Sequence, residues 1–222
     1  MFCPVCDFCY FESWGPSVRA HLVAHHEWEH GVRLRQLGAF ESVGRIADHE
    51  VLLVRPSSPI YARSRAERVS RRSIREPIFE GGYDVPQYCA DERFSPRVLN
   101  AHALLVARDS FGVGILVLER RPVIQHYRWT SRPEFELLNS IDDLVRWSIA
   151  HIWLHPKVRG QGIADQMVRA AAQGVNETPD TIGWLSPITR RAYHLMARVT
   201  VDGFHRAVQD LPSGEIVPRP FA

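Results

Sequence analysis

The chain contains 222 residues, of which 45% are hydrophobic and 23% charged, the proportions of an ordinary globular protein with one sizeable core. A formal net charge of +2 excludes a strongly basic nucleic-acid-binding tail and an acidic, solvated chain. No apolar run reaches the roughly eighteen residues of a membrane span, and the first residues lack the regions of a signal peptide. We therefore expect a cytoplasmic protein (nuclear or chromosome-associated in a eukaryote) with no membrane partner.

Residues 1–31 combine cysteines, histidines and aromatic residues, and end at a glycine that can stop a helix. A Cys-x2-Cys turn is followed by two histidines four residues apart, which places both imidazoles on one helix face. The metal ligands that this pattern predicts for a structural zinc site are Cys3, Cys6, His21 and His25. His26 is an alternative to His25, because finger spacings vary. The helix predicted over residues 17–29 has a single arginine, Arg19, and two glutamates, so direct nucleic-acid binding by this module is not favoured.

The stretch after this module is mixed in character. Residues 50–55 are predicted to form a strand, and residues 60–75 an arginine-rich helix. The six arginines spread over several faces of this helix, so a solvated surface with ion pairs to Glu67 and Glu76 is the default expectation. Docking of an acidic partner or of nucleic acid is the less favoured alternative. Cys89 stands alone in a loop without a recognisable histidine partner, which disfavours a covalent acyl-thiol route.

The clearest pattern lies in residues 101–222. Apolar runs and turn residues predict strands at 101–107, 114–118, 123–129, 149–155 and 181–185, and helices at 162–174 and 187–199. A linker is expected between the third and fourth of these strands. Antiparallel strands followed by a strand–helix–strand–helix unit predict an α/β (α+β) domain.

A glycine-rich turn follows the apolar strand of residues 149–154. Its sequence, Arg159-Gly160-Gln161-Gly162-Ile163-Ala164, fits the pattern Arg/Gln-x-x-Gly-x-Gly/Ala. The glycines allow a sharp turn that brings backbone N–H groups toward an anion, and the helix that begins there aims its positive end at the same point. Tight packing also selects glycine, but the preceding strand and the arginine favour a pyrophosphate site.

At these residues the sequence resembles the GNAT acetyltransferases, in which this motif binds the pyrophosphate of acetyl-CoA. A finger that begins Cys3-Pro4-Val5-Cys6 ahead of such a domain resembles the cohesion-establishment (Eco/ESCO-type) acetyltransferases, which acetylate lysines of a chromosomal ATPase subunit. The blocks that carry this resemblance are residues 51–59, 115–119, 126–128, 149–154 and 184–187. Their order and spacing cover most of the chain, so the shared architecture is the specific part of the resemblance.

The resemblance implies a GNAT acyltransferase fold with a mixed central sheet over residues 32–222, preceded by the zinc finger of residues 1–31. It implies acetyl-CoA and a structural Zn²⁺ as the bound groups. In that fold two parallel strands splay apart, and the pantetheine arm pairs with the open strand edge. The coenzyme-binding residues that follow from the resemblance are Ile152, Trp153, Leu154, Arg159, Gly160, Gln161, Gly162, Ile163, Ala164, Asp165, Ile188, Thr189 and Arg190.

The resemblance also implies direct attack by a neutral amine in a ternary complex, so a group must accept its proton. A tyrosine on the last helix often protonates the departing thiolate. Tyr193 stands at that place, with an aromatic packing role as the equal alternative. Two carboxylates of the family are absent, because Ser186 and Arg169 occupy their positions. The replacement bases considered are His151, His155, His194 and a water held by Ser186, which leaves Tyr193, Ser186 and His151 as the catalytic candidates.

These residues predict an acetyl-CoA-dependent N-acetyltransferase that acetylates a protein lysine or another primary amine and carries a structural zinc finger. Two alternatives stay open: an enzyme with a small-molecule amine as acceptor, and a non-catalytic protein that binds CoA or a protein partner. The missing carboxylates favour the alternatives, whereas the finger and the order of the blocks favour the protein acceptor.

Overall fold

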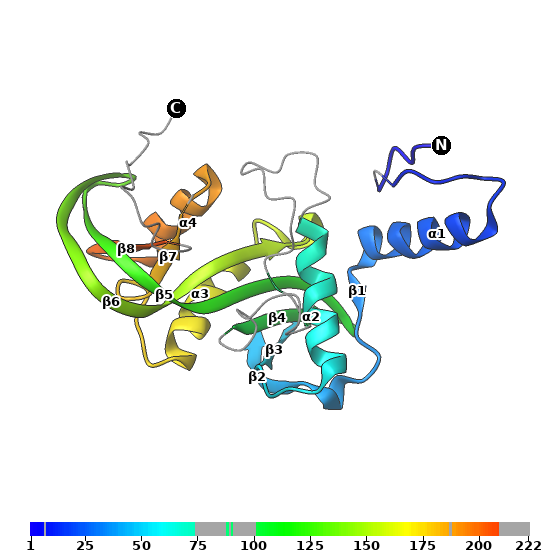
Figure 1. Cartoon of the computed structure of the whole chain (residues 1–222), viewed down its shortest axis with the longest axis horizontal. Coiled ribbons are helices and arrows are strands. Elements are labelled where there is room, and N and C mark those ends of the chain that lie inside the picture. The colour runs from blue at the N-terminus through cyan, green and yellow to red at the C-terminus, as the bar shows by residue number, and fades with distance from the viewer. Residues whose placement is uncertain (7, 74–87, 89, 91–100, 187, 209–222) are drawn as a thin grey trace.

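The computed structural model of the chain describes residues 1–6, 8–73, 88, 90, 101–186 and 188–208 (Figure 1). The helices are α1 (Gly15–His30), α2 (Ile60–Ser73), α3 (Ile163–Gly174) and α4 (Arg190–Val199), with short 3-10 turns at Leu37–Ala39 and Pro156–Val158. The strands are β1 (Val32–Arg33), β2 (Glu41–Ile46), β3 (His49–Val54), β4 (His102–Arg108), β5 (Phe111–Ser131), β6 (Glu134–Leu154), β7 (Gly183–Leu185) and β8 (Gly203–Ala207). In this part of the chain no helix is long and apolar enough to cross a membrane.

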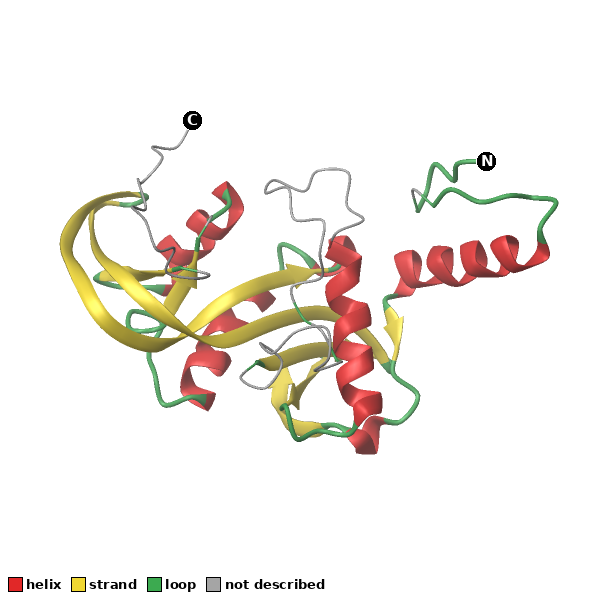
Figure 2. Ribbon diagram, viewed as in Figure 1, coloured by secondary structure: helices red, strands yellow, loops and turns green. Residues whose placement is uncertain are grey.

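A single twisted sheet organises the molecule (Figure 2). Its strand order is β2-β3-β4-β5-β6-β7-β8, and β1 pairs with the start of β5. Neighbouring strands are antiparallel except β6–β7 and β7–β8, which are parallel. β8 also pairs with β5, so the strands β5 to β8 close on themselves. The mixed sheet implied by the resemblance is confirmed.

Helices cover both faces of the sheet. α2 buries Ala62, Ala66 and Val69, which recur at helical spacing, against one face. α3 and α4 bury Met167 and Met196 among the apolar residues of the other face. The apolar stripe of each helix therefore determines which side of the sheet it covers.

Most of the predicted elements are confirmed, with shifted ends. The predicted strands correspond to β3, β4, parts of β5 and β6, and β7, and the predicted helices to α2, α3 and α4. α4 begins at Arg190 instead of residue 187, because Thr189 is its N-cap and accepts a hydrogen bond from the backbone N–H of Ala192 at 3.2 Å.

The prediction of a linker before residue 149 is wrong. Glu134–Leu154 is one continuous strand, β6, which pairs antiparallel with β5 along its length. The first half of β6 is rich in polar residues and lacks a regular apolar alternation, so the sequence gives little strand signal there. The backbone ladder to β5 forms the strand instead. β1, β2 and β8 are also absent from the predicted strands.

β6 and β7 separate soon after they meet. Their parallel pairing joins Ser148 to Gly183 and Ile149 to Trp184. A bulge at Ala150, where the register with β5 shifts, follows directly. A side chain at Gly183 would collide with the Ser148 hydroxyl, so glycine allows the close approach of the strands at this point. Beyond it, β6 and β7 diverge.

α1 extends from the body of the molecule, to which its C-terminal end is attached (Figure 2). Gly31 ends the helix with φ of 95°, and β1 then pairs with β5 at Gly112 and Phe111. A Cβ at Gly31 would lie 2.6 Å from the carbonyl oxygen of Gly112, so both the backbone angle and the lack of space require glycine. The helix end expected at this residue is confirmed.

Candidate functional site

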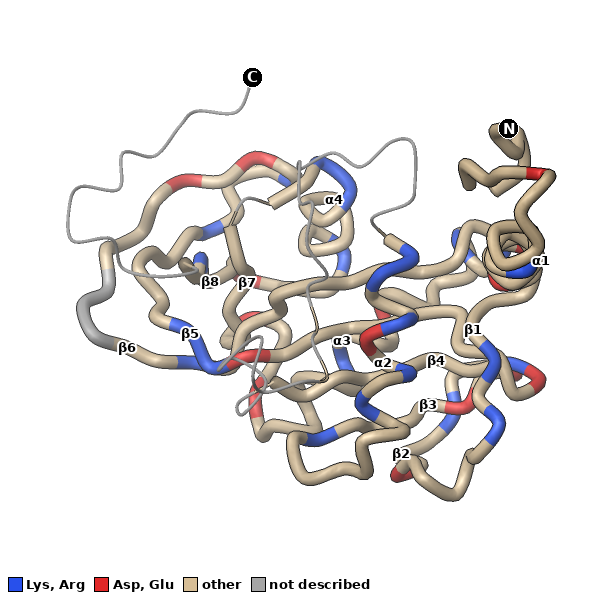
Figure 3. The backbone as a smooth tube through the Cα atoms, turned by 45° about the vertical axis from the view of Figure 1, so that its right-hand side comes forward, with Lys and Arg blue, Asp and Glu red and all other residues tan. Residues whose placement is uncertain are grey.

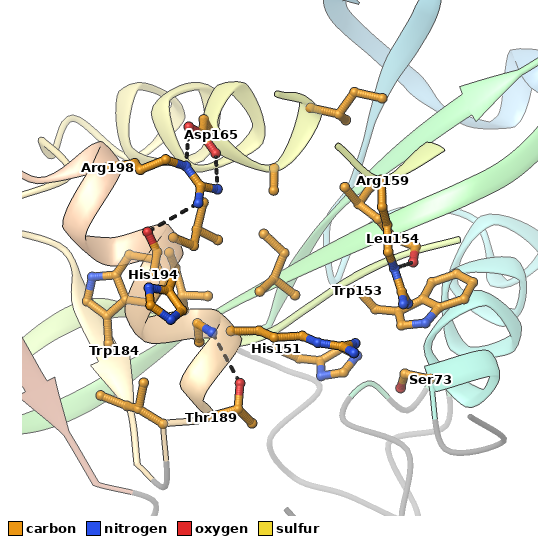
Figure 4. Close-up of a pocket in the computed structure, with 18 of the residues that line it drawn as sticks. Ser73, His151, Trp153, Leu154, Arg159, Asp165, Trp184, Thr189, His194 and Arg198 are labelled. Carbon is orange, nitrogen blue, oxygen red and sulfur yellow. Dashed lines mark hydrogen bonds and ion pairs between the residues drawn. The ribbon is translucent and has the colours of Figure 1, made fainter. Parts of the chain in front are cut away.

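A cavity of about 820 Å³ opens where β6 and β7 diverge (Figure 4). It is lined by Ser73 of α2; by Ile149, Ala150, His151, Ile152, Trp153 and Leu154 of β6; by Arg159, Gly160, Gly162, Ile163, Ala164 and Asp165; and by Trp184, Leu185, Ile188, Thr189, Arg191, Ala192, His194, Leu195 and Arg198. This volume is that of a pocket for an organic ligand of drug-like size.

The glycine-rich turn at one end of the cavity has the sharp backbone that the sequence predicts. Gly160 and Gly162 have φ of 77° and 72°, a region that side chains disfavour. Among the described residues, no atom comes within 4 Å of a Cβ placed at either position. The backbone conformation, and not crowding, therefore requires glycine. α3 begins at Ile163, so the N–H groups of its first turn lie at the cavity wall.

Arg159 lies between this turn and the end of β6. Its Nε donates a hydrogen bond to the carbonyl oxygen of Leu154 at 2.8 Å (Figure 4). Because Leu154 is the last residue of β6, this bond sets the spacing between the strand edge and the turn.

An ion pair joins α4, which forms the far wall of the cavity, to α3. Asp165 accepts two hydrogen bonds from the guanidinium of Arg198, at 3.0 and 2.8 Å, and this carboxylate raises the pKa of Arg198. Arg159, Arg191 and Arg198 line the cavity together with this one carboxylate. The lining therefore carries a net positive charge, which suits a ligand with phosphate groups.

The open edge of β6 forms the long wall of the cavity. Residues 149–154 all line it, whereas the parallel pairing with β7 ends at Ile149. The backbone N–H and C=O groups of this edge can pair with an extended ligand in the manner of an added strand. Ile152 and Trp153 pack into opposite apolar clusters of the protein, which holds the edge in place.

His151 lies on β6 directly after the bulge and lines the cavity (Figure 4). Its Nε2 is buried and has no hydrogen-bond partner among the described residues. Burial lowers the pKa of His151 to about 4, so the imidazole is neutral at pH 7. A neutral imidazole has one ring nitrogen without a proton, which can accept a hydrogen bond.

We expect His151 to make folding stability depend on pH in the acid range. Its folded-state pKa lies below the unfolded value of about 6.5, so the unfolded state binds more protons between these two values. The contribution of the neutral imidazole to the free energy of unfolding is then fully present above a pH of about 6.5, and it is lost as the pH falls toward about 4. The loss is below about 3 kcal/mol, because the residue as a whole is only partly buried.

Urea unfolding of the wild type and His151→Gln at several pH values between neutral and acid measures this effect. Other groups titrate alike in both proteins, so the difference isolates His151. The wild type should lose more free energy of unfolding than the variant over this range. Parallel losses would contradict the burial of a neutral imidazole.

All of the predicted coenzyme residues except Gln161 and Arg190 line the cavity. Gln161 is exposed and donates from Nε2 to the carbonyl oxygen of Lys157 at 3.4 Å. Arg190 is exposed at the start of α4. Binding of a coenzyme by any of these residues stays a prediction.

Of the three catalytic candidates, His151 lines the cavity, whereas Tyr193 and Ser186 do not. The ring of Tyr193 stacks on Phe135 at 5.3 Å, and burial raises the pKa of its hydroxyl. Ser186 accepts a hydrogen bond from Arg206 at 3.1 Å. The surroundings of Tyr193 match its packing alternative, and the proton-transfer roles of both residues stay predictions.

The other two histidines considered as bases differ in their positions. His194 is exposed and lines the cavity. His155 is buried, and its Nε2 donates to the carbonyl oxygen of Trp28 at 2.6 Å. It therefore has a structural partner in α1.

Several lining residues were not predicted as such. Arg191 and Arg198 stand seven residues apart on α4, so the sequence does place them on one helix face. Ser73 reaches the cavity from α2, and no sequence signal could have indicated this long-range contact. Cys89, considered for an acyl-thiol route, lies outside the described residues.

The N-terminal segment assembles the four predicted metal ligands. The donor atoms of Cys3, Cys6, His21 and His25 all lie within 4.8 Å of one another, and Cys3 Sγ is 3.5 Å from His25 Nδ1. A tetrahedral zinc site needs ligand atoms roughly 3.3–3.8 Å apart, so a small contraction closes it. His21 Nε2 is buried without a hydrogen-bond partner among the described residues, as a metal-binding nitrogen should be. The residues fit the metal.

Of the two histidines that the spacing left open, the structure places His25 in this cluster, and the choice of metal ligand stays a prediction. His26 lies outside it and packs its ring against His30 and Phe111, with centroids 4.6 and 5.6 Å away. Hydrogen bonds from the backbone of Cys6 and Val5 lower the pKa of Cys3 to about 6, which favours the metal-binding thiolate.

The helix α2, whose basic positions are blue in Figure 3, has one arginine that is buried instead of solvated. Arg71 pairs with Glu67 at 2.5 Å, as predicted. Arg72 is buried and pairs with Glu27 of α1 at 2.6 Å, so the expectation of a solvated surface is wrong for this residue. Glu27 neutralises a charge that could not otherwise be buried. The pairing expected with Glu76 lies outside the described residues.

Comparison with known proteins identifies the fold. No family model and no curated protein matches the chain. Among solved structures, the xEco2 acetyltransferase domain bound to a CoA conjugate is similar, with a TM-score of 0.52 and 19% identity over 78% of this chain and 99% of that one. A second structure of the xEco2 acetyltransferase domain gives a TM-score of 0.51 and 20% identity over 78% and 98% of the two chains. The chain therefore has the fold of a GNAT-type acetyltransferase domain.

Proposed function

We propose that the chain is an acetyl-CoA-dependent N-acetyltransferase that acetylates a protein lysine and carries a structural zinc finger. The observation that carries this proposal is one cavity that joins an open strand edge, a glycine-rich turn at a helix start and the imidazole of His151. The fold shared with acetyltransferase domains supports the same function.

The charge of the cavity gives CoA an orientation. The first N–H groups of α3 and the guanidinium of Arg159 form the end that suits a pyrophosphate. From there the pantetheine arm can follow the edge of β6, where its amides would pair with the backbone. This path brings the thioester toward the bulge at Ala150 and toward His151. That an acetyltransferase domain of the same fold binds a CoA conjugate supports this arrangement.

In this mechanism the protein forms no covalent intermediate with the acetyl group. A backbone N–H of the β6 edge polarises the thioester carbonyl, and the acceptor amine attacks its carbon. The C–S bond breaks as the C–N bond forms, and the proton lost by the amine ends on the CoA thiolate. His151 accepts the hydrogen bond of the attacking amine and relays this proton. The burial that keeps His151 neutral also disfavours an ammonium ion beside it, so the amine stays nucleophilic.

A protein lysine is the acceptor that we favour. The CoA conjugate bound to the similar xEco2 domain is formed with a lysine. Asp165 is the one carboxylate in the described lining, and Arg198 already pairs with it. No free carboxylate of the described lining would therefore stabilise a lysine ammonium ion, so a lysine would enter as the uncharged amine. Another primary amine, including a small molecule, is the competing acceptor that the experiment below distinguishes.

The zinc site is proposed to be structural, because the four protein ligands of the cluster would fill all four positions around a tetrahedral zinc ion. Zinc, when bound, supplies folding free energy to a module whose core is too small to fold alone. The cluster lies on the N-terminal segment and α1, apart from the cavity lining.

Acetyl transfer by His151→Gln tests the role of the imidazole. We expect kcat to fall by about 10²- to 10⁴-fold, the usual contribution of general acid–base catalysis, with acetyl-CoA affinity close to wild type. CoA release should be measured with lysine peptides, polyamines and aminoglycosides as acceptors. His194→Gln is the matched control, because this histidine lines the same cavity but is exposed.

Three outcomes would overturn parts of the proposal. If His194→Gln abolishes turnover and His151→Gln does not, the assignment of His151 is wrong. Turnover with polyamines but no peptide would replace the lysine acceptor by a small molecule. Acetyl-CoA binding without transfer to any acceptor would make the chain a non-catalytic CoA-binding protein.

A further inference from the structure

The last turn of α1 is bonded to the segment that connects β6 to the glycine-rich turn. His155 Nε2 donates to the carbonyl oxygen of Trp28 at 2.6 Å, and Lys157 Nζ donates to that of Glu29 at 2.9 Å. Carbonyls in the last turn of a helix have no partner within the helix and carry its negative end. The two bonds therefore cap α1 with side chains that stand 127 and 128 residues later in the sequence.

His155 is held from three sides. Its backbone N–H donates to the carbonyl oxygen of Val113 at 2.7 Å, and its Nδ1 accepts a hydrogen bond from the backbone N–H of Lys157 at 3.3 Å. Because a carbonyl can only accept, the bond to Trp28 places the proton on Nε2. The ring is buried and therefore has a fixed position between α1, β5 and the connecting segment.

The segment fixed in this way belongs to the coenzyme cavity. Leu154 before it and Arg159 after it both line the cavity and are joined by the bond from Arg159 Nε to the Leu154 carbonyl oxygen. A shift of residues 155–157 would move both ends of this bond. The position of α1 thus affects the spacing between the strand edge and the pyrophosphate turn.

α1 is bonded to a second wall of the same cavity. Arg72 of α2 donates to the carbonyl oxygen of Ala24 at 2.8 Å and to the carboxylate of Glu27 at 2.6 Å. Arg68 also pairs with Glu27, at 2.5 Å. The residue after Arg72, Ser73, lines the cavity.

α1 depends on the finger for its own order. It buries Ser17, Ala24 and Glu27 but no large apolar side chain, so tertiary packing along the helix is weak. A helix of its length is marginal in water without such packing. Its middle turns carry His21 and His25, which belong to the Cys2His2 cluster. Ligation there would stabilise the helix whose last turn holds the cavity segment.

We propose that His155 and Lys157 are positioning residues that couple metal binding in the finger to acetyl-CoA binding in the cavity. This inference rests on the proposed function, because it takes acetyl-CoA as the ligand of the cavity. Coupling between two binding sites is reciprocal. Zinc should therefore tighten acetyl-CoA, and acetyl-CoA should tighten zinc by the same factor.

The experiment compares these two factors in the full chain. Acetyl-CoA is titrated by calorimetry into zinc-loaded and chelator-treated protein, and zinc affinity is measured against a chromophoric chelator with and without acetyl-CoA. We expect both factors to be equal and at least about fivefold, the lower end of typical coupling. Amide hydrogen exchange should show that zinc removal exposes residues 155–162 while β4 keeps its protection.

Lys157 offers a matched pair of variants, because its side chain is exposed and lies outside both sites. Lys157→Met removes the donor to the Glu29 carbonyl and keeps an apolar stem, so the coupling factor should decrease. Lys157→Arg keeps a donor that reaches the same carbonyl, so the factor should return toward that of the wild type. A structural role alone would change stability in Lys157→Met and leave the factor unchanged.

The possible results distinguish the coupling from the proposed function. Equal acetyl-CoA affinity with and without zinc overturns the coupling and leaves the proposed function intact. No acetyl-CoA binding by the zinc-loaded chain overturns the proposed function, and the coupling with it. Loss of protection in β4 on zinc removal would mean that the metal supports the whole fold, which also overturns the local route through His155 and Lys157.

Discussion

Gly160→Glu is expected to weaken acetyl-CoA binding by about 100-fold or more. The substitution brings a carboxylate to the turn that we assign to the pyrophosphate, where like charges cost several kcal/mol. It also forces a side chain onto a residue with φ of 77°, which costs roughly 1–2 kcal/mol. Isothermal titration of the purified variant with acetyl-CoA measures the loss.

Gly44→Glu is the matched control. Gly44 also has positive φ, 146°, and no described atom lies within 4 Å of a Cβ there. It is exposed on β2 and does not line the cavity, so the same charge is added to another residue of positive φ, away from the site. Its affinity for acetyl-CoA should match that of the wild type. Equal weakening in both variants, or in neither, would contradict the assignment of the turn.

Cys6→Ser is expected to abolish zinc binding by the finger. Cys6 is a buried member of the Cys2His2 cluster, and a serine hydroxyl is a poor substitute for a thiolate ligand. Structural zinc sites of this type contribute about 10–16 kcal/mol of apparent binding free energy, which depends on a complete ligand set. Metal content by atomic absorption and the affinity in competition with a chelator measure the effect.

Cys9→Ser provides the control for this change. Cys9 is exposed and is not a member of the cluster, although it lies three residues from Cys6. The variant should keep one zinc per chain at wild-type affinity. A Cys9→Ser protein that loses zinc, or a Cys6→Ser protein that keeps it, would show that a different set of ligands holds the metal.

The predictable parts of the fold are those with local signals. α2 shows its buried face as alanine and valine at helical spacing, and Gly31 marks the end of α1 through a backbone angle that only glycine adopts readily. The first half of β6 has no such signal, because its strand conformation depends on β5 as a partner. β8 completes the closed set of strands by pairing with β5, again a contact between distant segments.

The candidate site also has parts that the sequence predicts and parts that it does not. The glycine-rich turn and the Cys2His2 cluster are short motifs whose residue types and spacing are visible in the sequence, and the structure assembles both. The bonds from His155 and Lys157 to α1 span 127 and 128 residues and leave no sequence pattern. His155 illustrates the difference: its sequence position suggested a base, whereas its three partners give it a structural role.

Native mass spectrometry of the full chain with zinc and acetyl-CoA is the most direct test of a zinc-finger acetyltransferase. We predict one zinc and one acetyl-CoA per chain for the wild type, and zinc without acetyl-CoA for Gly160→Glu. A wild-type chain that binds zinc but no acetyl-CoA would contradict the proposed function.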